Sequence, residues 1–252
     1  MSTPPTAGLR DARALLIGAG GLGCGAALGL GAAGVGHLVV VDDDVVDESN
    51  LHRQVLHDEA RIGTAKASSL VEGLRTRFPA IEVTGVRGRF DPDTAARLVD
   101  ACDVVLDGSD NLATKFLAND AAVLGRKPLI HAAAVGTVGQ LLTVSAGGRP
   151  CYRCLFEELP PPEADALSCA EAGVMGPVPG VMGALQAAEA VALLLGRAPA
   201  YAGALLQYDA EAFTFRRVRF HRNADCRVCG DRPSIQILDS GNYPGATCVA
   251  SP

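Results

Sequence analysis

The sequence predicts an α/β fold, a Rossmann-like domain whose largely parallel sheet is extended by antiparallel strands. Two observations indicate the parallel part. A glycine-rich turn, Gly18-Ala19-Gly20-Gly21-Leu22-Gly23, follows a short apolar run, and strand and helix patterns then alternate as far as residue 131. A third observation indicates the antiparallel part, because two strand patterns then follow each other with no helix between them.

The first half of the chain is predicted from short apolar runs and from helical spacing of apolar residues. Residues 14–17 are apolar and end at the glycine turn, and the small residues at 24–33 suit a closely packed helix. The next apolar run, 37–41, ends at Asp42 and is predicted as the second strand. The same two patterns continue with helices at 63–78, 93–100 and 111–124 and with strands at 81–86, 104–107 and 128–131.

The second half begins with a strand at 139–144, which follows the preceding strand directly. Residues 157–180 contain several acidic residues and the run Pro160-Pro161-Pro162, and they are predicted as a long crossover loop. A buried helix and a hairpin of two strands follow, at 181–195, 204–208 and 212–220. We expect one domain over residues 1–230, with a nucleotide-binding part at 14–150, a cysteine-containing part at 151–230, and a tail at 231–252 with little to pack.

The composition favours a compact intracellular protein. Hydrophobic residues make up 48% of the 252 residues and charged residues 20%. The net charge of -6 offers no basic surface for nucleic acid or for an anionic membrane. Residues 1–13 lack the apolar core of a signal peptide, and the apolar stretch at 26–35 is too short to span a bilayer. We therefore expect a cytoplasmic location, where the eight cysteines are ligands or nucleophiles rather than disulfides.

The glycine turn and Asp42 together indicate an adenosine ligand. Gly18, Gly20 and Gly23 fill the three positions of a Gly-x-Gly-x-x-Gly turn, which lets backbone N–H groups approach a phosphate. Asp42 ends the second predicted strand, where a carboxylate accepts hydrogen bonds from both ribose hydroxyls. Two alternatives stay open at this point: glycines that are needed only for a tight turn, and an NAD site.

Two basic residues after Asp42 favour a triphosphate over NAD. Arg53 follows in the segment Glu48-Ser49-Asn50-Leu51-His52-Arg53-Gln54, and Lys66 closes Gly63-Thr64-Ala65-Lys66 at a predicted helix start. A triphosphate needs compensating cations close to the ribose carboxylate, whereas a dinucleotide does not. Each residue taken singly also suits a solvated surface.

Five motifs make the chain resemble the E1-like activating enzymes, in particular the MoeB/ThiF/HesA branch, over residues 15–230. They are Gly-Ala-Gly-Gly-Leu-Gly at 18–23, Ser-Asn-Leu-His-Arg-Gln at 49–54, Gly-Thr-Ala-Lys at 63–66, Asp-Gly-Ser-Asp-Asn at 107–111 and Glu-Ala-Gly-Val-Met-Gly-Pro at 171–177. Members of this branch adenylate small sulfur-carrier proteins of the ubiquitin fold. The resemblance therefore implies ATP and Mg²⁺ as ligands and a ubiquitin-like carrier ending in Gly-Gly as partner.

The resemblance also implies roles for individual residues. Gly21 would contact the nucleotide phosphates and Asp42 the ribose, while Asp110 would hold Mg²⁺ with Asn111 beside it. Catalytic roles fall to Arg53, Lys66 and Asp110. The whole implied nucleotide site consists of Gly18, Gly20, Gly21, Gly23, Asp42, Ser49, Asn50, Arg53, Gln54, Lys66, Asp110 and Asn111. A homodimer and a sulfurtransferase partner are implied in the same way.

Two Cys-x-x-Cys pairs predict a metal site. Cys151 and Cys154 form one pair and Cys226 and Cys229 the other, and four such thiolates make a closed tetrahedral Zn²⁺ site. The long separation between the pairs leaves a redox or disulfide role open. In the family that the chain resembles, the same pairs form a structural zinc site away from the nucleotide.

The remaining cysteines are interpreted one by one. Cys24 and Cys102 fall within predicted elements and are expected to be small core residues, and Cys248 lies in the tail. Cys169 lies in the predicted crossover loop. In related enzymes the cysteine of this motif attacks the acyl-adenylate or takes part in sulfur transfer, so Cys169 is a candidate thiol; the alternative is an incidental small residue.

Several functions compete at this level. The leading hypothesis is adenylation of a sulfur carrier; the alternatives are adenylation of another carboxylate (a peptide or a tRNA-bound group), a non-catalytic activating-enzyme half, and an NAD-dependent oxidoreductase. Family members carry an N-terminal arginine that reaches the partner subunit's nucleotide. Here Arg10 and Arg13 are too close to the first strand to be assigned that role, and this motivates the non-catalytic alternative.

Overall fold

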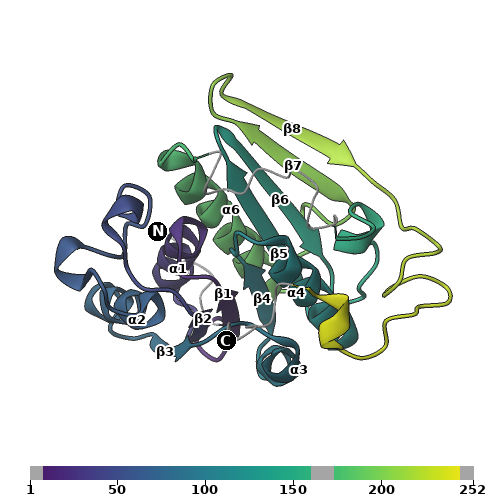
Figure 1. Cartoon of the computed structure of the whole chain (residues 1–252), viewed down its shortest axis with the longest axis horizontal. Coiled ribbons are helices and arrows are strands. Elements are labelled where there is room, and N and C mark those ends of the chain that lie inside the picture. The colour runs from purple at the N-terminus through teal and green to yellow at the C-terminus, as the bar shows by residue number, and fades with distance from the viewer. Residues whose placement is uncertain (1–7, 160–172, 245–252) are drawn as a thin grey trace, which may run out of the picture.

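One eight-stranded sheet forms the centre of the molecule (Figure 1). The computed structural model describes residues 8–159 and 173–244. The strands are β1 (Arg13–Ile17), β2 (His37–Asp42), β3 (Glu82–Arg87), β4 (Val104–Asp107), β5 (Leu129–Val135), β6 (Val138–Val144), β7 (Ala204–Asp209) and β8 (Thr214–Arg219). The helices are α1 (Gly21–Ala33), α2 (Lys66–Arg77), α3 (Pro92–Asp100), α4 (Leu112–Leu124) and α6 (Pro177–Leu194), with short 3-10 helices η1 (Glu48–Asn50), η2 (Glu59–Arg61), η3 (Tyr152–Cys154) and η4 (Ser240–Asn242).

The sheet has a parallel half and an antiparallel half. Its order is β3-β2-β1-β4-β5-β6-β7-β8. The pairs among β3, β2, β1, β4 and β5 are all parallel, and those from β5 through β8 are all antiparallel. The predicted α/β fold is therefore confirmed, as is the change of direction where β6 follows β5 without a helix.

Helices cover both faces of the sheet and enclose two hydrophobic cores. On one face, α1, α2 and α6 supply core residues such as Leu30, Leu70 and Met182. On the other face, α3, α4 and η3 supply Val99, Phe116 and Tyr152. Because the helices after β1 and β4 lie on opposite faces, the carboxyl ends of these two neighbouring strands form the point where the winding of the fold reverses.

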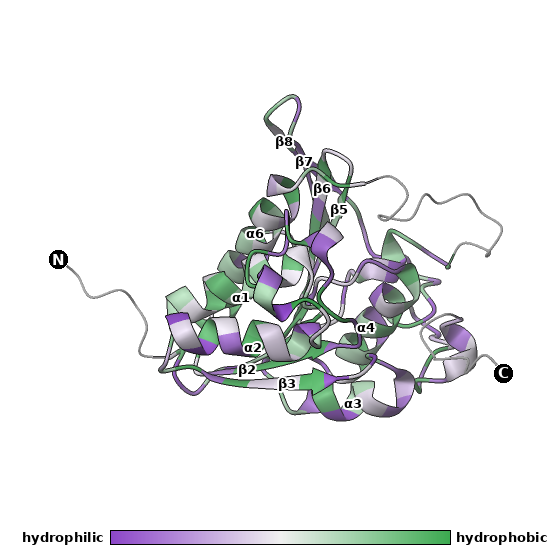
Figure 2. Cartoon of the chain, turned by 60° about the vertical axis from the view of Figure 1, so that its left-hand side comes forward, coloured by the Kyte–Doolittle hydropathy of each residue, from purple (hydrophilic) through white to green (hydrophobic). Residues whose placement is uncertain are grey.

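The helices α1 and α6 approach closely because small residues line their contact (Figure 2). A Cβ added at Gly29 would lie 2.5 Å from the Cβ of Ala187, and one added at Gly183 would lie 2.3 Å from the Leu22 carbonyl oxygen. A side chain at either position would force the helices apart. Close packing of small residues thus supplies contacts in a chain that has no Trp and few aromatic residues.

The helix α6 is long and apolar enough to span a membrane by length and composition alone, unlike the other helices among the described residues. In this fold it packs against α1 and β5. Its carboxylate Glu189 is buried and accepts hydrogen bonds from the Thr143 hydroxyl at 2.9 Å and from the Tyr201 N–H at 3.0 Å. We therefore interpret α6 as a core helix.

Several element boundaries differ from the sequence prediction. The helix α6 begins at Pro177 rather than at 181, because proline is tolerated in a first turn whose N–H groups have no partner within the helix. The helix α1 begins at Gly21 rather than at 24, so two glycines of the turn are helical. Residues 160–172, most of the predicted crossover loop, lie outside the described residues.

The prediction that the chain after residue 230 has little to pack is wrong for the part described. Ile235 and Tyr243 are both buried in the core that contains α4 and η3. The Tyr243 hydroxyl donates a hydrogen bond to the buried carboxylate of Asp120 at 2.9 Å. The sequence after residue 230 shows no helical or strand spacing of apolar residues, and the buried apolar residues in its described part, Ile235 and Tyr243, are widely spaced.

Candidate nucleotide-binding site and metal centre

The predicted nucleotide residues gather at the carboxyl end of the parallel strands. The glycine turn follows β1, Asp42 ends β2, and Asp110 follows β4. In open α/β sheets, ligands bind outside the carboxyl ends of the strands where the winding reverses, and here that point lies between β1 and β4. The topology therefore places the glycine turn and Asp110 beside one another.

The glycine turn is packed tightly against its neighbours. Gly18 has a φ of +93°, and a Cβ there would lie 2.9 Å from the Gly108 carbonyl oxygen. A Cβ at Gly21 would lie 2.9 Å from Pro179 and 3.1 Å from the Arg53 carbonyl oxygen, and one at Gly23 would lie 2.0 Å from the Gly18 carbonyl oxygen. Packing alone thus requires glycine at these three positions, whereas Gly20 has more space around it.

Asp42 holds the glycine turn in place. Its Oδ2 accepts a hydrogen bond from the Ala19 N–H at 2.7 Å, and its Oδ1 accepts one from the Asp44 N–H at 2.8 Å. Burial raises the pKa of Asp42, and these hydrogen bonds and the charge of Lys66 oppose that rise. Each carboxylate oxygen has a second lone pair, so the same group can still accept hydrogen bonds from ribose hydroxyls.

The two predicted cations have partners within the chain. Lys66 is buried, and its Nζ lies 2.8 Å from Asp44 Oδ2. Arg53 donates hydrogen bonds to the Asn50 side chain and, at 3.4 Å, to the Ser49 carbonyl oxygen. The structure thus brings Ser49, Asn50 and Arg53 together at η1, with the Arg53 carbonyl against Gly21.

Ser49 and Gln54, two further residues of the predicted nucleotide site, differ in whether their side chains already have hydrogen-bond partners. The Ser49 hydroxyl donates to Asp47 Oδ1 at 2.5 Å, so it already has a partner. Gln54 is only 3% exposed, and its Oε1 has no hydrogen-bond donor among the described residues. Its Nε2 lies 3.6 Å from where a Cβ of Gly20 would be. Gln54 therefore presents an unpaired acceptor close to the glycine turn.

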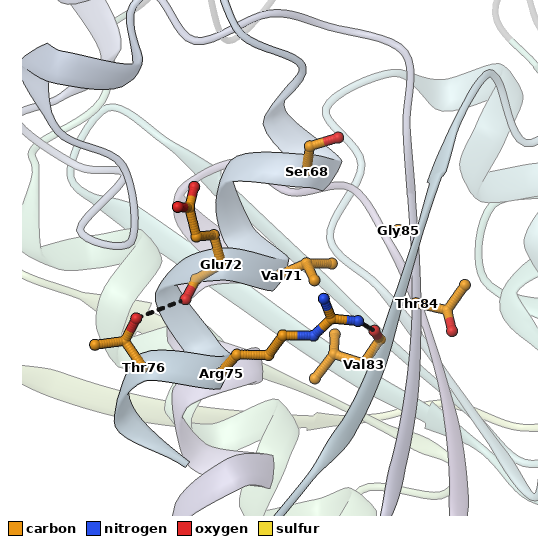
Figure 3. A pocket seen from close by; sticks show the side chains of 8 residues that line it. All are labelled: Ser68, Val71, Glu72, Arg75, Thr76, Val83, Thr84 and Gly85. Atoms are coloured by element: carbon orange, nitrogen blue, oxygen red, sulfur yellow. Dashed lines mark hydrogen bonds between the residues drawn. The ribbon is translucent and has the colours of Figure 1, made fainter. Parts of the chain in front are cut away.

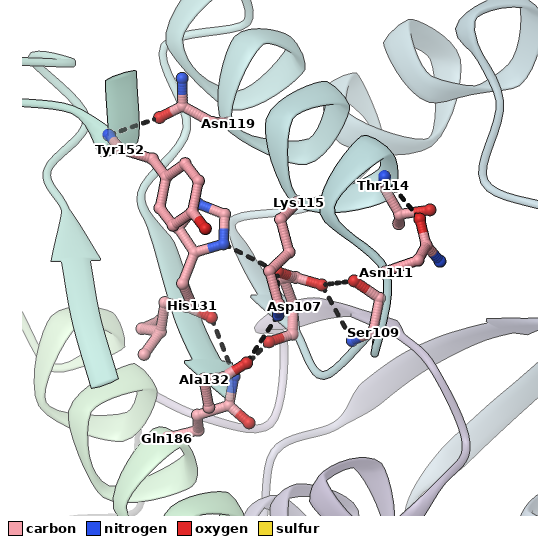
Figure 4. Close-up of polar contacts among 11 residues, drawn as sticks. Asp107, Ser109, Asn111, Thr114, Lys115, Asn119, His131, Ala132, Tyr152 and Gln186 are labelled. Atoms are coloured by element: carbon pink, nitrogen blue, oxygen red, sulfur yellow. Dashed lines mark hydrogen bonds and ion pairs between the residues drawn. The ribbon is translucent and has the colours of Figure 1, made fainter. Parts of the chain in front are cut away.

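A buried charge cluster that the sequence analysis did not predict lies beneath the turn after β4 (Figure 4). The Asp107 carboxylate is fully buried and accepts hydrogen bonds from His131 Nδ1 at 2.7 Å, Lys115 Nζ at 3.1 Å and the Ser109 N–H at 2.9 Å. Burial favours a raised pKa, but the Lys115 ammonium and the His131 hydrogen bond hold the pKa of Asp107 well below its usual value. An ionised Asp107 thus fixes the turn that presents Asp110.

Asp110 and Asn111 differ in their availability. Asp110 is exposed and has no hydrogen-bond or ion-pair partner among the described residues, so its carboxylate is free to bind a cation. Asn111 caps α4, and its Oδ1 accepts a hydrogen bond from the Thr114 N–H at 2.8 Å. The oxygen of Asn111 is therefore already used, while its amide N–H groups remain.

Two cavities lie away from the glycine turn. A wide groove of about 830 Å³ runs between α2 and β3, where Arg75 donates to the Val83 carbonyl oxygen at 2.9 Å (Figure 3). It contains none of the predicted site residues. A small cavity of about 20 Å³, room for a single water molecule, lies beside His131 and Tyr152. The His131 Nε2 is buried without a partner among the described residues.

The four cysteines of the two Cys-x-x-Cys pairs form a cluster. Their sulfur atoms all lie within 4.8 Å of one another, with Cys151 to Cys226 at 3.6 Å and Cys154 to Cys229 at 3.4 Å. Four sulfurs about 2.3 Å from a central zinc would be about 3.8 Å apart in a tetrahedron. The cysteines are unpaired thiols, so their geometry fits a Zn²⁺ ion rather than two disulfides.

Other cysteines match their interpretation or lie outside the described residues. Cys24 and Cys102 are buried core residues, as predicted, and burial raises the pKa of each thiol to about 12. Both are therefore protonated and unreactive at neutral pH. Cys169 and Cys248 lie outside the described residues.

A second buried ion pair supports the cysteine cluster. Arg153 lies between Cys151 and Cys154 and binds both carboxylate oxygens of Asp120, with Nη2 to Oδ2 at 2.8 Å and Nε to Oδ1 at 2.9 Å. The Asp120 side chain is fully buried in α4, and Tyr243 donates to the same carboxylate. The Cys151–Cys154 segment, α4 and the C-terminal segment thus meet at the buried carboxylate of Asp120.

Sequence reasoning missed five buried polar residues: Asp107, Lys115, Asp120, His131 and His57. Lys115 and Asp120 lie on α4, and two charged residues on an apolar helix are a sequence signal for buried ion pairs. No local signal connects His131 to Asp107, because their contact arises from neighbouring strands β4 and β5.

An open α/β sheet with a glycine turn at its reversal point and a separate four-cysteine cluster defines a nucleotide-binding protein of the E1-like type. Comparison with known proteins agrees. Residues 3–228 match the ThiF family, and the chain belongs to this family.

Similar relatives include the "Adenylyltransferase and sulfurtransferase MOCS3" of Sus scrofa, 47% identical over 243 residues, and that of Aedes aegypti, 42% identical over 231 residues. The matches cover 96% and 91% of this chain but 53% of each relative. The chain thus spans about half the length of these relatives.

Solved structures show the same fold. The chain is similar to E. coli MccB in complex with succinimide, with a TM-score of 0.77 and 21% identity, over 90% of this chain and 68% of that chain. It is also similar to PaaA, with a TM-score of 0.71 and 18% identity, over 86% and 67% of the two chains. At these identities the likeness concerns the fold.

Proposed function

We propose that this protein is an ATP-dependent adenylyltransferase that activates the C-terminal Gly-Gly carboxylate of a ubiquitin-like sulfur-carrier protein. The observation that carries the proposal is the glycine turn, which contacts both the segment containing Arg53 and the turn before Asp110, in a chain whose relatives are named adenylyltransferases. An NAD-dependent oxidoreductase would have no use for this set of cations and a free carboxylate.

The chemistry is a substitution at the α-phosphate of ATP. A carboxylate oxygen of the carrier attacks the α-phosphorus, the bond to the bridging oxygen of the β-phosphate breaks, and pyrophosphate leaves with that electron pair. Both reactants are anions, so catalysis consists of holding them in line and of neutralising charge. No general base is needed, because the attacking carboxylate is ionised at neutral pH.

The chain's own residues supply positioning and positive charge. The N–H groups at the start of α1 face the phosphates, and Asp42 accepts hydrogen bonds from the ribose. Arg53 and Lys66 exchange their partners Asn50 and Asp44 for phosphate oxygens. Asp110 would hold Mg²⁺, which would neutralise phosphate charge when bound. The Cys169 thiol remains a candidate for attack on the acyl-adenylate.

The proposed function also includes a structural metal, an oligomeric state, a location and a downstream partner. The four-cysteine cluster binds a structural zinc, which contributes folding energy rather than chemistry. The enzyme acts as a homodimer in the cytoplasm, delivers the activated carrier to a sulfurtransferase, and does not use nucleic acid or a membrane. A single domain over residues 1–230 carries the activity, with its nucleotide-binding part at 14–150 and its zinc-site part at 151–230.

The test is direct adduct formation. The protein is incubated with Mg-ATP and with each Gly-Gly-terminated carrier of the same genome, and the carrier is weighed by mass spectrometry. We expect one carrier to gain the mass of AMP, and ATP–pyrophosphate exchange to depend on that carrier. The variant Asp110→Ala should lose at least a hundredfold in exchange rate, as expected when a group at the reacting centre is removed. Glu211→Ala, an exposed carboxylate in the β7–β8 turn, is the matched control.

Three outcomes would contradict the proposal in different ways. No adduct with any carrier, together with unchanged behaviour of Asp110→Ala, would exclude carrier adenylation. An adduct on an unrelated peptide would move the reaction to another carboxylate. Activity that appears only after a second, different chain is added would favour the non-catalytic half.

A further inference from the structure

His57 is a buried imidazole that connects the glycine turn to α2. Its side chain is 7% exposed. Nε2 lies 2.9 Å from the Ala19 carbonyl oxygen, inside the glycine turn, and Nδ1 lies 2.8 Å from the Ser69 hydroxyl. Ser69 stands three residues after Lys66, one turn further along α2. The imidazole therefore bridges the turn and the helix that supplies a predicted phosphate-binding lysine.

The two contacts determine which nitrogen carries the proton. A carbonyl oxygen can only accept, so Nε2 is protonated and donates to Ala19. Nδ1 then has a free lone pair, and it accepts the hydrogen bond of the Ser69 hydroxyl. Burial lowers the pKa of His57, and the cations Lys66 and Arg61 add to this effect, while the Ala19 hydrogen bond and the Asp58 carboxylate oppose it. The neutral ring is therefore satisfied at both nitrogens.

The contact with Ala19 determines the direction of the next N–H group. The Ala19–Gly20 peptide is trans, so its carbonyl and its N–H point in opposite directions. With the Ala19 oxygen turned to His57, the Gly20 N–H points away from it. Among the described residues this N–H has no acceptor. The Cys24 thiol also approaches the Ala19 oxygen, at 3.7 Å, but a thiol is a weak donor.

Ala19 is restrained at its other end as well. Its N–H donates to Asp42 Oδ2, so its two backbone polar groups are held by two different side chains. Each of the two peptide planes that meet at Ala19 is thus held by one hydrogen bond to a side chain, and neither can rotate without breaking that hydrogen bond. Gly20 itself imposes no such restraint, because glycine adopts many backbone conformations.

We propose that His57 is a positioning residue for the nucleotide. It holds the Ala19–Gly20 peptide so that the Gly20 N–H faces the phosphate of bound ATP, and through Ser69 it keeps this peptide in register with Lys66. The inference rests on the proposed function for the identity of the ligand. The alignment of the peptide itself is a property of the protein without nucleotide.

The test compares three variants. His57→Leu removes the donor, His57→Gln keeps an N–H that can reach the Ala19 oxygen, and His37→Gln changes a half-exposed histidine that pairs with Glu82 far from the turn. We expect the dissociation constant for Mg-ATP, measured by calorimetry without any carrier, to rise about tenfold in His57→Leu, the effect of losing about one hydrogen bond to a charged group. His57→Gln should stay within about threefold of wild type, and His37→Gln should not change.

A second measurement needs no ligand. Two-bond ¹H–¹⁵N spectra should show His57 neutral with the proton on Nε2, and the Gly20 amide signal should move in His57→Leu but be restored in His57→Gln. A proton on Nδ1, or equal Mg-ATP affinity in all three variants at matched unfolding temperatures, would overturn the proposal. Wild type that binds Mg-ATP but adenylates no carrier would refute only the proposed function; wild type that binds no Mg-ATP would refute both.

Discussion

Replacing Asp120 by asparagine should destabilise the protein, because it breaks a buried ion pair beside the cysteine cluster. The carboxylate is fully buried and binds Arg153 through two oxygens. Asparagine has nearly the same shape but no charge, so Arg153, itself 2% exposed, would remain buried without its counter-ion. Removing one partner of a buried ion pair costs about 3–5 kcal/mol of unfolding free energy. Tyr243→Phe removes only one hydrogen bond to the same group, about 1.5–3 kcal/mol.

The assay is urea unfolding followed by circular dichroism, at a fixed zinc concentration. We expect Asp120→Asn to lower the midpoint more than Tyr243→Phe, with the dependence on urea unchanged. Since Arg153 lies between two of the cysteines, Asp120→Asn should also lower the zinc content of the purified protein. Glu211→Gln, in an exposed turn, is the control. Asp120→Asn within about 1 kcal/mol of wild type, or a larger loss for Tyr243→Phe, would show that the pair is not the anchor of this region.

Three further predictions follow from the described geometry. Gly23→Ala places a Cβ 2.0 Å from the Gly18 carbonyl oxygen, so it should lower the free energy of unfolding by about 1–3 kcal/mol and weaken Mg-ATP binding. The control Gly180→Ala, with nothing within 4 Å of its Cβ, should do neither, and equal melting temperatures of the two variants would contradict this prediction. Native mass spectrometry should detect one zinc per chain, and Cys154→Ser should remove it and lower the unfolding temperature; full stability after chelation would exclude a structural metal. The pKa of His57 in the folded protein lies below its value of 6.5 in the unfolded chain. Below pH 6.5 the unfolded chain therefore binds a proton that the folded protein does not, and the free energy of unfolding falls with pH by at most about 1.4 kcal/mol per pH unit. Urea midpoints of wild type and His57→Gln should therefore converge between pH 7 and pH 5, and a constant difference would mean that His57 does not titrate in this way.

The order of elements was predictable because it depends on local patterns. Apolar runs marked the strands from β1 to β6, and the missing helix after β5 correctly indicated the change from parallel to antiparallel pairing. The boundaries were less predictable. Two prolines near residue 177 favour a loop by local preference, yet the first turn of α6 accommodates them, because its N–H groups have no partner within the helix.

Some features of the candidate site were likewise predictable from the sequence, and others were not. The sequence by itself determined the glycine turn, its acidic partner Asp42 and the four cysteines, since each of these follows from residue type and spacing. Only the tertiary structure decided that Ala19 is held between Asp42 and His57, that Asp107 is buried with Lys115 and His131, and that Tyr243 closes over Asp120. The physical reason is that a buried polar group must find a partner wherever the fold brings one, and the partner is often distant in sequence.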